Sequence, residues 1–148
     1  MQDGIFDKGQ RDMILGVDFG DSRTGFAASD ALGFSAHTLE TYAEKNPKKV
    51  AEYTARLAKD LNAEKIVVGL PKNMNGTIGE RGKKTKVFAE KVRELTGLEV
   101  ILWDERLTTV SAHNLMNETN TRGKKRKDSV DKIAAAFILQ AYLDSKKF

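Results

Sequence analysis

Hydrophobic and polar positions change their spacing along the chain, and these changes predict where strands and helices lie. Three short segments come first: an apolar run at Met13–Val17, then Thr24–Ser29 and Phe34–Thr41, joined by short links. Short apolar or alternating runs bounded by turn-forming residues are typical of strands. Because parallel neighbours need a long crossover, the short links favour an antiparallel meander.

Helical spacing begins near Pro47, a residue type favoured in the first turn of a helix, with Asn46 before it as the predicted N-cap. Apolar and small residues then recur at steps of three and four, at Val50, Thr54, Leu57 and Leu61, which predicts an amphipathic helix. The next segment, Lys65–Leu70, is continuously apolar. Such a run is expected of a parallel strand that is covered on both faces.

Helices and strands alternate through the rest of the chain. A second helix carries Phe88, Val92 and Leu95 on one face and ends at Gly97. A strand at Glu99–Trp103 and a third helix at about Leu107–Asn117 follow. The last helix, from Ser129 to about Leu143, is apolar almost all round and should pack deeply. The order predicts an α/β fold, a mixed sheet with helices on both faces.

Length and composition predict one domain. The chain has 148 residues, of which 40% are hydrophobic, enough for a single core. Residues 1–12 are polar and without period, so we expect a flexible tail there and one domain over residues 13–148. No apolar run approaches the roughly 20 residues that span a bilayer, and the start lacks a signal peptide's apolar stretch. We therefore expect a cytoplasmic protein without a membrane partner.

The side chains available for chemistry are restricted. The chain has no cysteine, which excludes disulfides, thiolate zinc sites and cysteine nucleophiles. Its two histidines, His37 and His113, are far apart, which argues against a zinc hydrolase. The net charge of +4 is modest, so only its distribution could indicate nucleic acid. Any chemistry must rest on carboxylates, hydroxyls and basic groups.

Three carboxylates stand at the ends of predicted elements. Asp18 follows the first strand, Glu105 follows the fifth, and Asp131 lies in an otherwise apolar helix. Each has a structural alternative: Asp18 could close its own turn, and Glu105 could pair with Arg106 at the surface. Asp128, three residues before Asp131, is the better candidate for a helix cap.

Carboxylates that cluster without cysteine or histidine suit Mg²⁺ or Mn²⁺. Two such ions roughly 3.5–4 Å apart can activate water and stabilise the leaving oxygen in phosphodiester hydrolysis. The pattern therefore favours a metal-dependent hydrolase, with the structural alternatives still open.

Four blocks of the sequence resemble the YqgF family of RuvX-like proteins, pre-16S rRNA nucleases or Holliday junction resolvases of bacteria. These blocks are GVDFGDSRTGFAASD, VVGLPKNMNGTIGER, LWDERLTT and VDKIAAAFILQAYLD. They span Ile14–Asp144, nearly the whole chain after the tail. The resemblance implies a ribonuclease H-like fold with a five-stranded mixed sheet whose second strand is antiparallel.

The resemblance also implies the site. It makes Asp18, Glu105 and Asp131 the catalytic acids that bind Mg²⁺ or Mn²⁺, with a two-metal site expected. Residues that match the family's blocks and would contact nucleic acid are Arg23, Arg106, Thr108 and Thr109. In one loop Asn75 stands where an aspartate is common in the family, which puts a catalytic role for that position in doubt. The implied activity is endonucleolytic processing of the 5′ end of pre-16S rRNA.

A basic stretch precedes the last helix. Five of the six residues from 122 to 127 are basic, namely Arg122, Lys124, Lys125, Arg126 and Lys127. By itself such a run is usually a solvated loop, but beside a catalytic helix it is a candidate for binding phosphates. A second cluster at Arg81, Lys83, Lys84 and Lys86 is either a second phosphate contact or the outer face of the second helix.

Other functions remain as alternatives. One is a Holliday junction resolvase acting on branched DNA, which would need a two-fold dimer for paired cuts. Another is a nucleic-acid-binding factor without cleavage. An ATPase with DFGDSRTG as its phosphate loop would need two domains, and this chain holds one. The expected partners are structured RNA or branched DNA and a pre-ribosomal particle, with the choice between monomer and homodimer open.

Overall fold

The computed structural model of the protein describes residues 13–30, 33–104 and 123–146, and it describes side chains in the last range from residue 133 onward. In these ranges the strands form one mixed sheet, with β1 (Ile14–Asp18), β2 (Arg23–Ser29), β3 (Ala36–Ala43), β4 (Lys65–Leu70) and β5 (Glu99–Asp104). Their order across the sheet is β3-β2-β1-β4-β5. β2 is antiparallel to β1 and β3, whereas β4 is parallel to β1 and β5. The predicted meander and the antiparallel second strand are confirmed.

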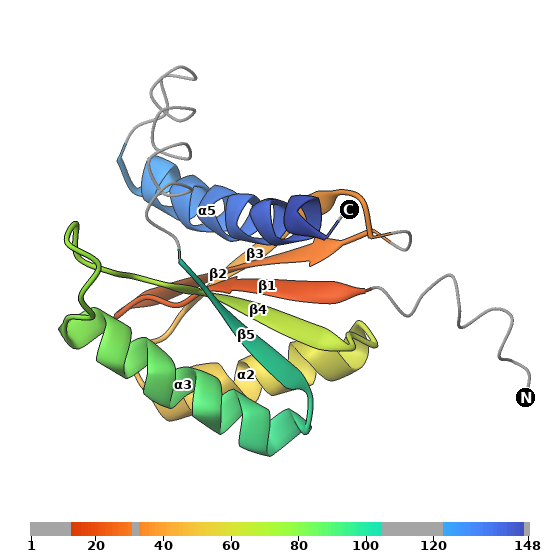
Figure 1. The fold of residues 1–148 in the computed structure, drawn as a ribbon, viewed down its shortest axis with the longest axis horizontal. Coiled ribbons are helices and arrows are strands. Elements are labelled where there is room, and N and C mark those ends of the chain that lie inside the picture. The colour runs from red at the N-terminus through yellow and green to blue at the C-terminus, as the bar shows by residue number, and fades with distance from the viewer. Residues whose placement is uncertain (1–12, 31–32, 105–122, 147–148) are drawn as a thin grey trace, which may run out of the picture.

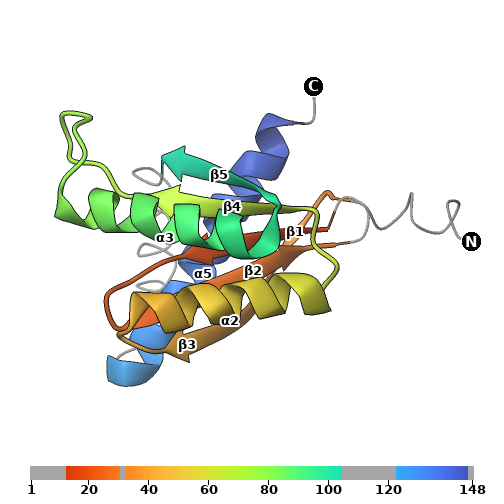
Figure 2. The ribbon, with the colours of Figure 1, turned by 90° about the horizontal axis from the view of Figure 1, so that it is seen from below.

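Helices cover both faces of the sheet in three layers (Figure 1). α2 (Pro47–Asp60) and α3 (Glu80–Thr96) lie side by side on one face, and α5 (Gly123–Ser145) lies on the other. Figure 2, turned by 90°, shows α2 and α3 in front of the strands and α5 behind them. The predicted α/β fold is confirmed. The predicted tail at residues 1–12 and the predicted helix at Leu107–Asn117 lie outside the described residues.

Side chains of the central strands point alternately to the two faces of the sheet, so the core has two parts. Leu15 and Val17 of β1 pack with Val68 of β4 and Phe88 of α3 on one face. On the other face Val67 of β4 packs with α5. β4 is buried on both faces, so its continuous apolar run is explained as predicted.

The helix ends follow the predicted signals. The Asn46 side chain accepts a hydrogen bond from the Lys48 backbone N–H at 3.0 Å, and Gly97 ends α3 in a left-handed conformation, with φ of 71°. The predicted apolar face of α3 is wrong at Leu95, which is 44% exposed. The buried stripe includes Ala89 and Val92, and its next position along the helix is Thr96 rather than Leu95.

The start of the last helix corrects the sequence prediction. α5 begins at Gly123, six residues before the predicted start at Ser129. Lysine and arginine are good helix formers, so Lys124, Lys125, Arg126 and Lys127 belong to the helix and do not form a loop before it. Asp128 therefore lies inside α5 and is not its N-cap.

The apolar part of α5 packs deeply, as predicted. Its residues Ala135, Ile138, Leu139 and Tyr142 are buried against the sheet. Trp103 of β5 packs edge-on against the Tyr142 ring, with 5.8 Å between ring centroids. The tryptophan therefore belongs to the core. No helix in the described ranges is both long and apolar enough to cross a bilayer.

α5 and β1 approach closely at Gly16. A Cβ atom at this position would lie 2.9 Å from Leu139 Cβ and 3.1 Å from the Ala135 carbonyl oxygen. Cβ atoms do not pack at 2.9 Å without displacement of a neighbour, and both neighbours belong to a buried helix. Glycine is therefore required at position 16 for α5 to rest on the centre of the sheet.

We expect Gly16→Ala to destabilise the protein by about 1–3 kcal/mol, the typical cost of forcing an extra methyl group into a packed core. Urea unfolding followed by circular dichroism measures the change. The control is Ala43→Gly at an exposed strand position, which measures the intrinsic difference between the two residues. A Gly16→Ala variant as stable as the unmodified protein would contradict the close approach of α5 and β1.

Candidate functional site

Several element ends meet at one edge of the sheet. The carboxyl ends of β1, β4 and β5 point the same way, and the amino-terminal ends of α3 and α5 lie at that same end of the molecule in both views (Figures 1 and 2). Ligands in α/β proteins commonly bind where parallel strands end. This edge is therefore the candidate site.

Asp18 is the last residue of β1 and is partly buried at this edge. Side chains of a strand alternate between its faces. Leu15 and Val17 pack on the side of α2 and α3, and position 16 faces Leu139 of α5. Asp18 therefore belongs to the α5 face of the sheet. Arg23, the first residue of β2, lies at the same end and is also partly buried.

The alternation of side chains along β5 shows on which face of the sheet Asp104 lies. Leu102 packs in the core beside α2 and α3, whereas Trp103 packs beside α5. Asp104 therefore lies on the face opposite to Asp18, and its carboxylate is 3.9 Å from the Lys72 ammonium.

The backbone of α5 leads towards Asp18. Ala135 and Leu139 lie over Gly16. The amino-terminal end of α5 lies at the candidate site, and the helix runs from there towards the opposite end of the sheet (Figure 1). Asp131 is one helical turn before Ala135, in the direction of the carboxyl end of β1. The side chain of Asp131 is outside the part that the structure describes.

Most of the other predicted site residues cannot be compared with the structure. Glu105, Arg106, Thr108, Thr109 and Arg122 lie outside the described residues. Lys124, Lys125, Arg126 and Lys127 lie in the first turns of α5, with side chains outside the description. Among the described side chains, no three of the types His, Cys, Asp and Glu gather closely enough to hold a metal ion. The three-acid site therefore stays a prediction.

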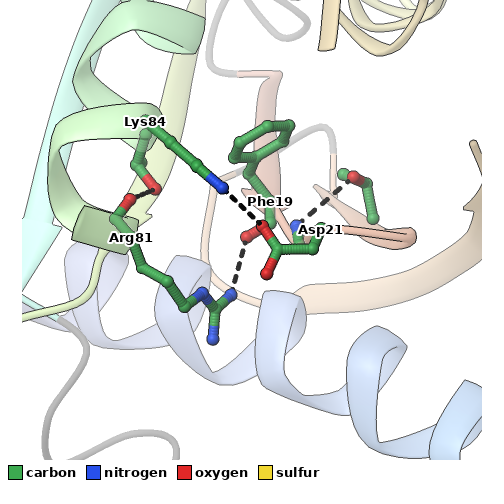
Figure 3. A network of polar contacts seen from close by, with 7 residues as sticks. Phe19, Asp21, Arg81 and Lys84 are labelled. Atoms are coloured by element: carbon green, nitrogen blue, oxygen red, sulfur yellow. Dashed lines mark hydrogen bonds and ion pairs between the residues drawn. The ribbon is translucent and has the colours of Figure 1, made fainter. Parts of the chain in front are cut away.

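The turn between β1 and β2, directly after Asp18, contacts α3 (Figure 3). The Arg81 guanidinium donates a hydrogen bond from Nη2 to the Phe19 carbonyl oxygen at 3.1 Å. The Lys84 ammonium lies 3.8 Å from the Asp21 carboxylate. The sequence suggested both cations only as members of a basic cluster. No sequence signal indicated their contact with a turn some sixty residues earlier.

The loop between β4 and α3 is tied by its own side chains. Asn73 donates from Nδ2 to Thr77 Oγ1 at 2.9 Å, and Thr77 Oγ1 donates to Asn75 Oδ1 at 2.7 Å. Gly76 has a positive φ of 87°, a conformation that favours glycine. The side chains of the two asparagines thus stabilise the turn of this loop. The loop projects at the candidate site edge (Figure 1).

Two other features lie away from this edge. A pocket of about 420 Å³ is lined by residues at the C-terminal ends of α2 and α3, including Asn62 and Leu98, near the beginnings of β4 and β5. Asp30 follows the far end of β2, and the backbone N–H of Phe34 holds the pKa of this carboxyl below its usual value. Neither feature can take part in chemistry at Asp18.

Sequence comparisons give the family. The profile of the RuvX family, described as Holliday junction resolvase, matches residues 12–145. A protein of Bacillus cytotoxicus is 51% identical over 135 residues, covering 90% of this chain and 98% of that protein. One of Agathobacter rectalis is 50% identical over 134 residues, covering 88% and 94%. Both carry the name "Putative pre-16S rRNA nuclease".

Structural comparisons give the fold. RuvC of T. thermophilus, solved with a Holliday junction substrate, matches with a TM-score of 0.56 and 13% identity, covering 91% of this chain and 96% of that chain. The Fowlpox virus resolvase, solved with Holliday junction DNA, matches with a TM-score of 0.57 and 14% identity, covering 92% and 99%. These matches confirm the predicted ribonuclease H-like fold.

Proposed function

The chain belongs to the RuvX family of nucleases, which are hydrolases that act on phosphodiester bonds, and we propose that its substrate is the precursor of 16S rRNA. One observation supports this substrate. Relatives whose sequences are about 50% identical to this chain over nearly their whole length bear the name "Putative pre-16S rRNA nuclease". The proposed reaction is endonucleolytic processing at the 5′ end of that precursor.

The proposed catalytic acids are Asp18, Glu105 and Asp131. Asp18 is on the α5 face of the sheet, and the backbone of α5 brings position 131 towards the end of β1. Along β5, Trp103 is on the α5 face and Asp104 on the other. Glu105 is the next residue in the sequence, and its assignment rests on the resemblance of its block. The positions of Asp18 and of the α5 backbone support one shared site.

The donor set fits a hard divalent cation. All three side chains are carboxylates, and oxygen ligands are those that Mg²⁺ and Mn²⁺ prefer. Asp18, Glu105 and Asp131 would hold one or two such ions. When bound, the metal supplies activation of a water molecule and stabilisation of the leaving oxygen in phosphodiester hydrolysis. The carboxylates fix its place at the end of β1.

Basic and hydroxyl residues around the acids would hold the nucleic acid. Arg23 begins β2 at the same end of the sheet as Asp18 and is partly buried, which supports a phosphate contact near that end. The other proposed contacts are Arg106, Thr108, Thr109, Arg122, Lys124, Lys125, Arg126 and Lys127. Contacts of this kind position the phosphate backbone without selecting a base sequence.

The second candidate function is resolution of branched DNA. It is favoured by the description of the matching family profile as Holliday junction resolvase. Paired cuts across a junction need two active sites related by a two-fold axis, so this function requires a homodimer. Processing of an RNA end can proceed with a monomer.

One cleavage assay separates these functions. Equal amounts of pre-16S RNA, a four-way DNA junction and single-stranded RNA are incubated with the protein and Mg²⁺ or Mn²⁺. We expect specific cuts near the 5′ end of the 16S precursor and slower cleavage of the others. Faster, symmetric cleavage of the junction would favour the resolvase, and binding without cleavage of any substrate would contradict the nuclease function.

A further inference from the structure

We propose that Arg81 is a positioning residue for Asp18, an inference that rests on the proposed function of Asp18 as a metal ligand. Arg81 lies in the first turn of α3, and its Nη2 donates to the carbonyl oxygen of Phe19 (Figure 3). Phe19 directly follows Asp18. The hydrogen bond therefore restrains the peptide group between Phe19 and Gly20, next to the proposed ligand.

α3 holds Phe19 at two points. Phe19 is 6% exposed, and its ring stacks on the ring of Phe88, with 4.2 Å between centroids and 9° between planes. The Arg81 hydrogen bond fixes the carbonyl of the same residue. With ring and carbonyl both held by one helix, the backbone leaving Asp18 has little freedom to rotate.

The rest of the turn is held from the sheet side. The Gly20 N–H donates to Thr24 Oγ1 at 3.5 Å, and the Ser22 carbonyl accepts from the Glu44 N–H at 3.1 Å. The first of these is long and therefore weak. A metal ligand has to be held within about 0.5 Å of its productive place. The charged hydrogen bond from Arg81 is the stronger restraint on this side of Asp18.

A positioning role of Arg81 can be distinguished from the other effects that its positive charge could have. If Arg81 acted only through its charge, it would repel the metal, and its removal would tighten metal binding. If it only contacted phosphate, its removal would weaken nucleic-acid binding and leave metal binding unchanged. If it positions Asp18, its removal weakens metal binding even without nucleic acid. The direction of the change in metal affinity thus separates the three roles.

The test is a titration of the full-length protein with Mn²⁺ alone, in which free Mn²⁺ is measured by electron paramagnetic resonance. Arg81→Met keeps most of the side-chain length and removes the donor. We expect its Kd for Mn²⁺ to rise by about 3–10-fold. This is less than the roughly 10–100-fold seen when a partner bonded directly to a metal ligand is lost. Arg81→Lys, which keeps a charged donor, should recover part of the affinity.

Lys84→Met is the matched control. Lys84 is on the same helix and contacts the same turn, but its ion pair with Asp21 joins side chains that are 61% and 65% exposed. Exposed pairs contribute little, so we expect its Mn²⁺ affinity to stay within about twofold of the unmodified protein. Amide NMR shifts of Phe19 and Gly20 should move in Arg81→Met and not in Lys84→Met.

Asp18→Asn, titrated alongside, separates the two proposals. If Asp18→Asn weakens Mn²⁺ binding and Arg81→Met leaves it unchanged or tightens it, the positioning role is wrong and the metal site stands. If Asp18→Asn leaves Mn²⁺ binding unchanged, the metal site is wrong, and the role of Arg81 is overturned with it. Urea unfolding of each variant verifies that only folded protein is compared.

Discussion

Replacing Asp18, Glu105 or Asp131 by its amide is expected to abolish phosphodiester cleavage while the fold is kept. Each amide has nearly the shape of the acid but lacks the charge that binds a hard cation. Loss of repulsion between neighbouring carboxylates should leave the thermal stability equal or slightly higher. The measurements are cleavage of pre-16S RNA with Mg²⁺ and thermal unfolding, for each of Asp18→Asn, Glu105→Gln and Asp131→Asn.

Asp128→Asn is the matched control for Asp131→Asn. Both residues lie in α5, three positions apart, and both variants exchange an acid for an amide. Aspartate and asparagine have similar helix propensities, so the stability should change by less than about 1 kcal/mol. Cleavage should stay within roughly tenfold, a barrier change of about 1.4 kcal/mol. A complete loss in Asp128→Asn would mean that α5 supplies two ligands, and wild-type activity in any triad variant would remove that residue from the site.

Neutralising the basic stretch of α5 is expected to flatten the salt dependence of nucleic-acid binding. Each phosphate contact changes the slope of log affinity against log salt by about 0.9 on duplex and about 0.7 on single strands. Because Lys124, Lys125, Arg126 and Lys127 lie in α5, successive positions lie on different sides of the helix axis. We therefore expect about two simultaneous contacts, a change of about 1.8 on duplex or 1.4 on single strands. In a loop, more of these basic side chains could contact phosphates at the same time.

The variant for this test replaces Arg122, Lys124, Lys125, Arg126 and Lys127 with glutamine, which preserves helix propensity. Binding is titrated at four salt concentrations in the inactive Asp131→Asn background. Affinity should fall alike for different sequences, since phosphate contacts carry no base information. The control variant neutralises Lys83 and Lys86 on α3, which are exposed. A flatter slope in the control, with no change in the α5 variant, would place the phosphate contacts on α3.

The sequence predicted the elements of the fold where local signals agree. Each of three local signals predicts a single structure, and the structure contains all three. They are the N-cap at Asn46, the helix end at Gly97 and the continuously apolar strand β4. The predicted start of α5 was wrong because apolar spacing begins only near residue 130, whereas the helix also includes lysine and arginine residues, which have high helix propensity but give no apolar spacing. Hydrophobic periodicity detects only the part of a helix that carries an apolar face.

The candidate site was predicted in part. Asp18 followed from its place after a buried strand, and the alternation of β5 explains why Asp104 pairs with Lys72 on the opposite face. Contacts between distant segments have no periodic signal, so the hydrogen bond from Arg81 to Phe19 needed the structure. Glu105 and Asp131 rest on the resemblance of their blocks, since the structure does not describe their side chains.

The packing of α5 on β1 has a consequence for the timing of folding during synthesis. The last helix of the described chain rests on Gly16 of the first strand and also contacts β2 and β3. Such contacts between segments far apart in sequence close a long loop and form late. A nascent chain still attached to the ribosome therefore exposes the apolar α5 face of its sheet. The proposed acids on β1 and α5 can come together only after α5 has been synthesised, so a chain that lacks α5 is expected to have no nuclease activity.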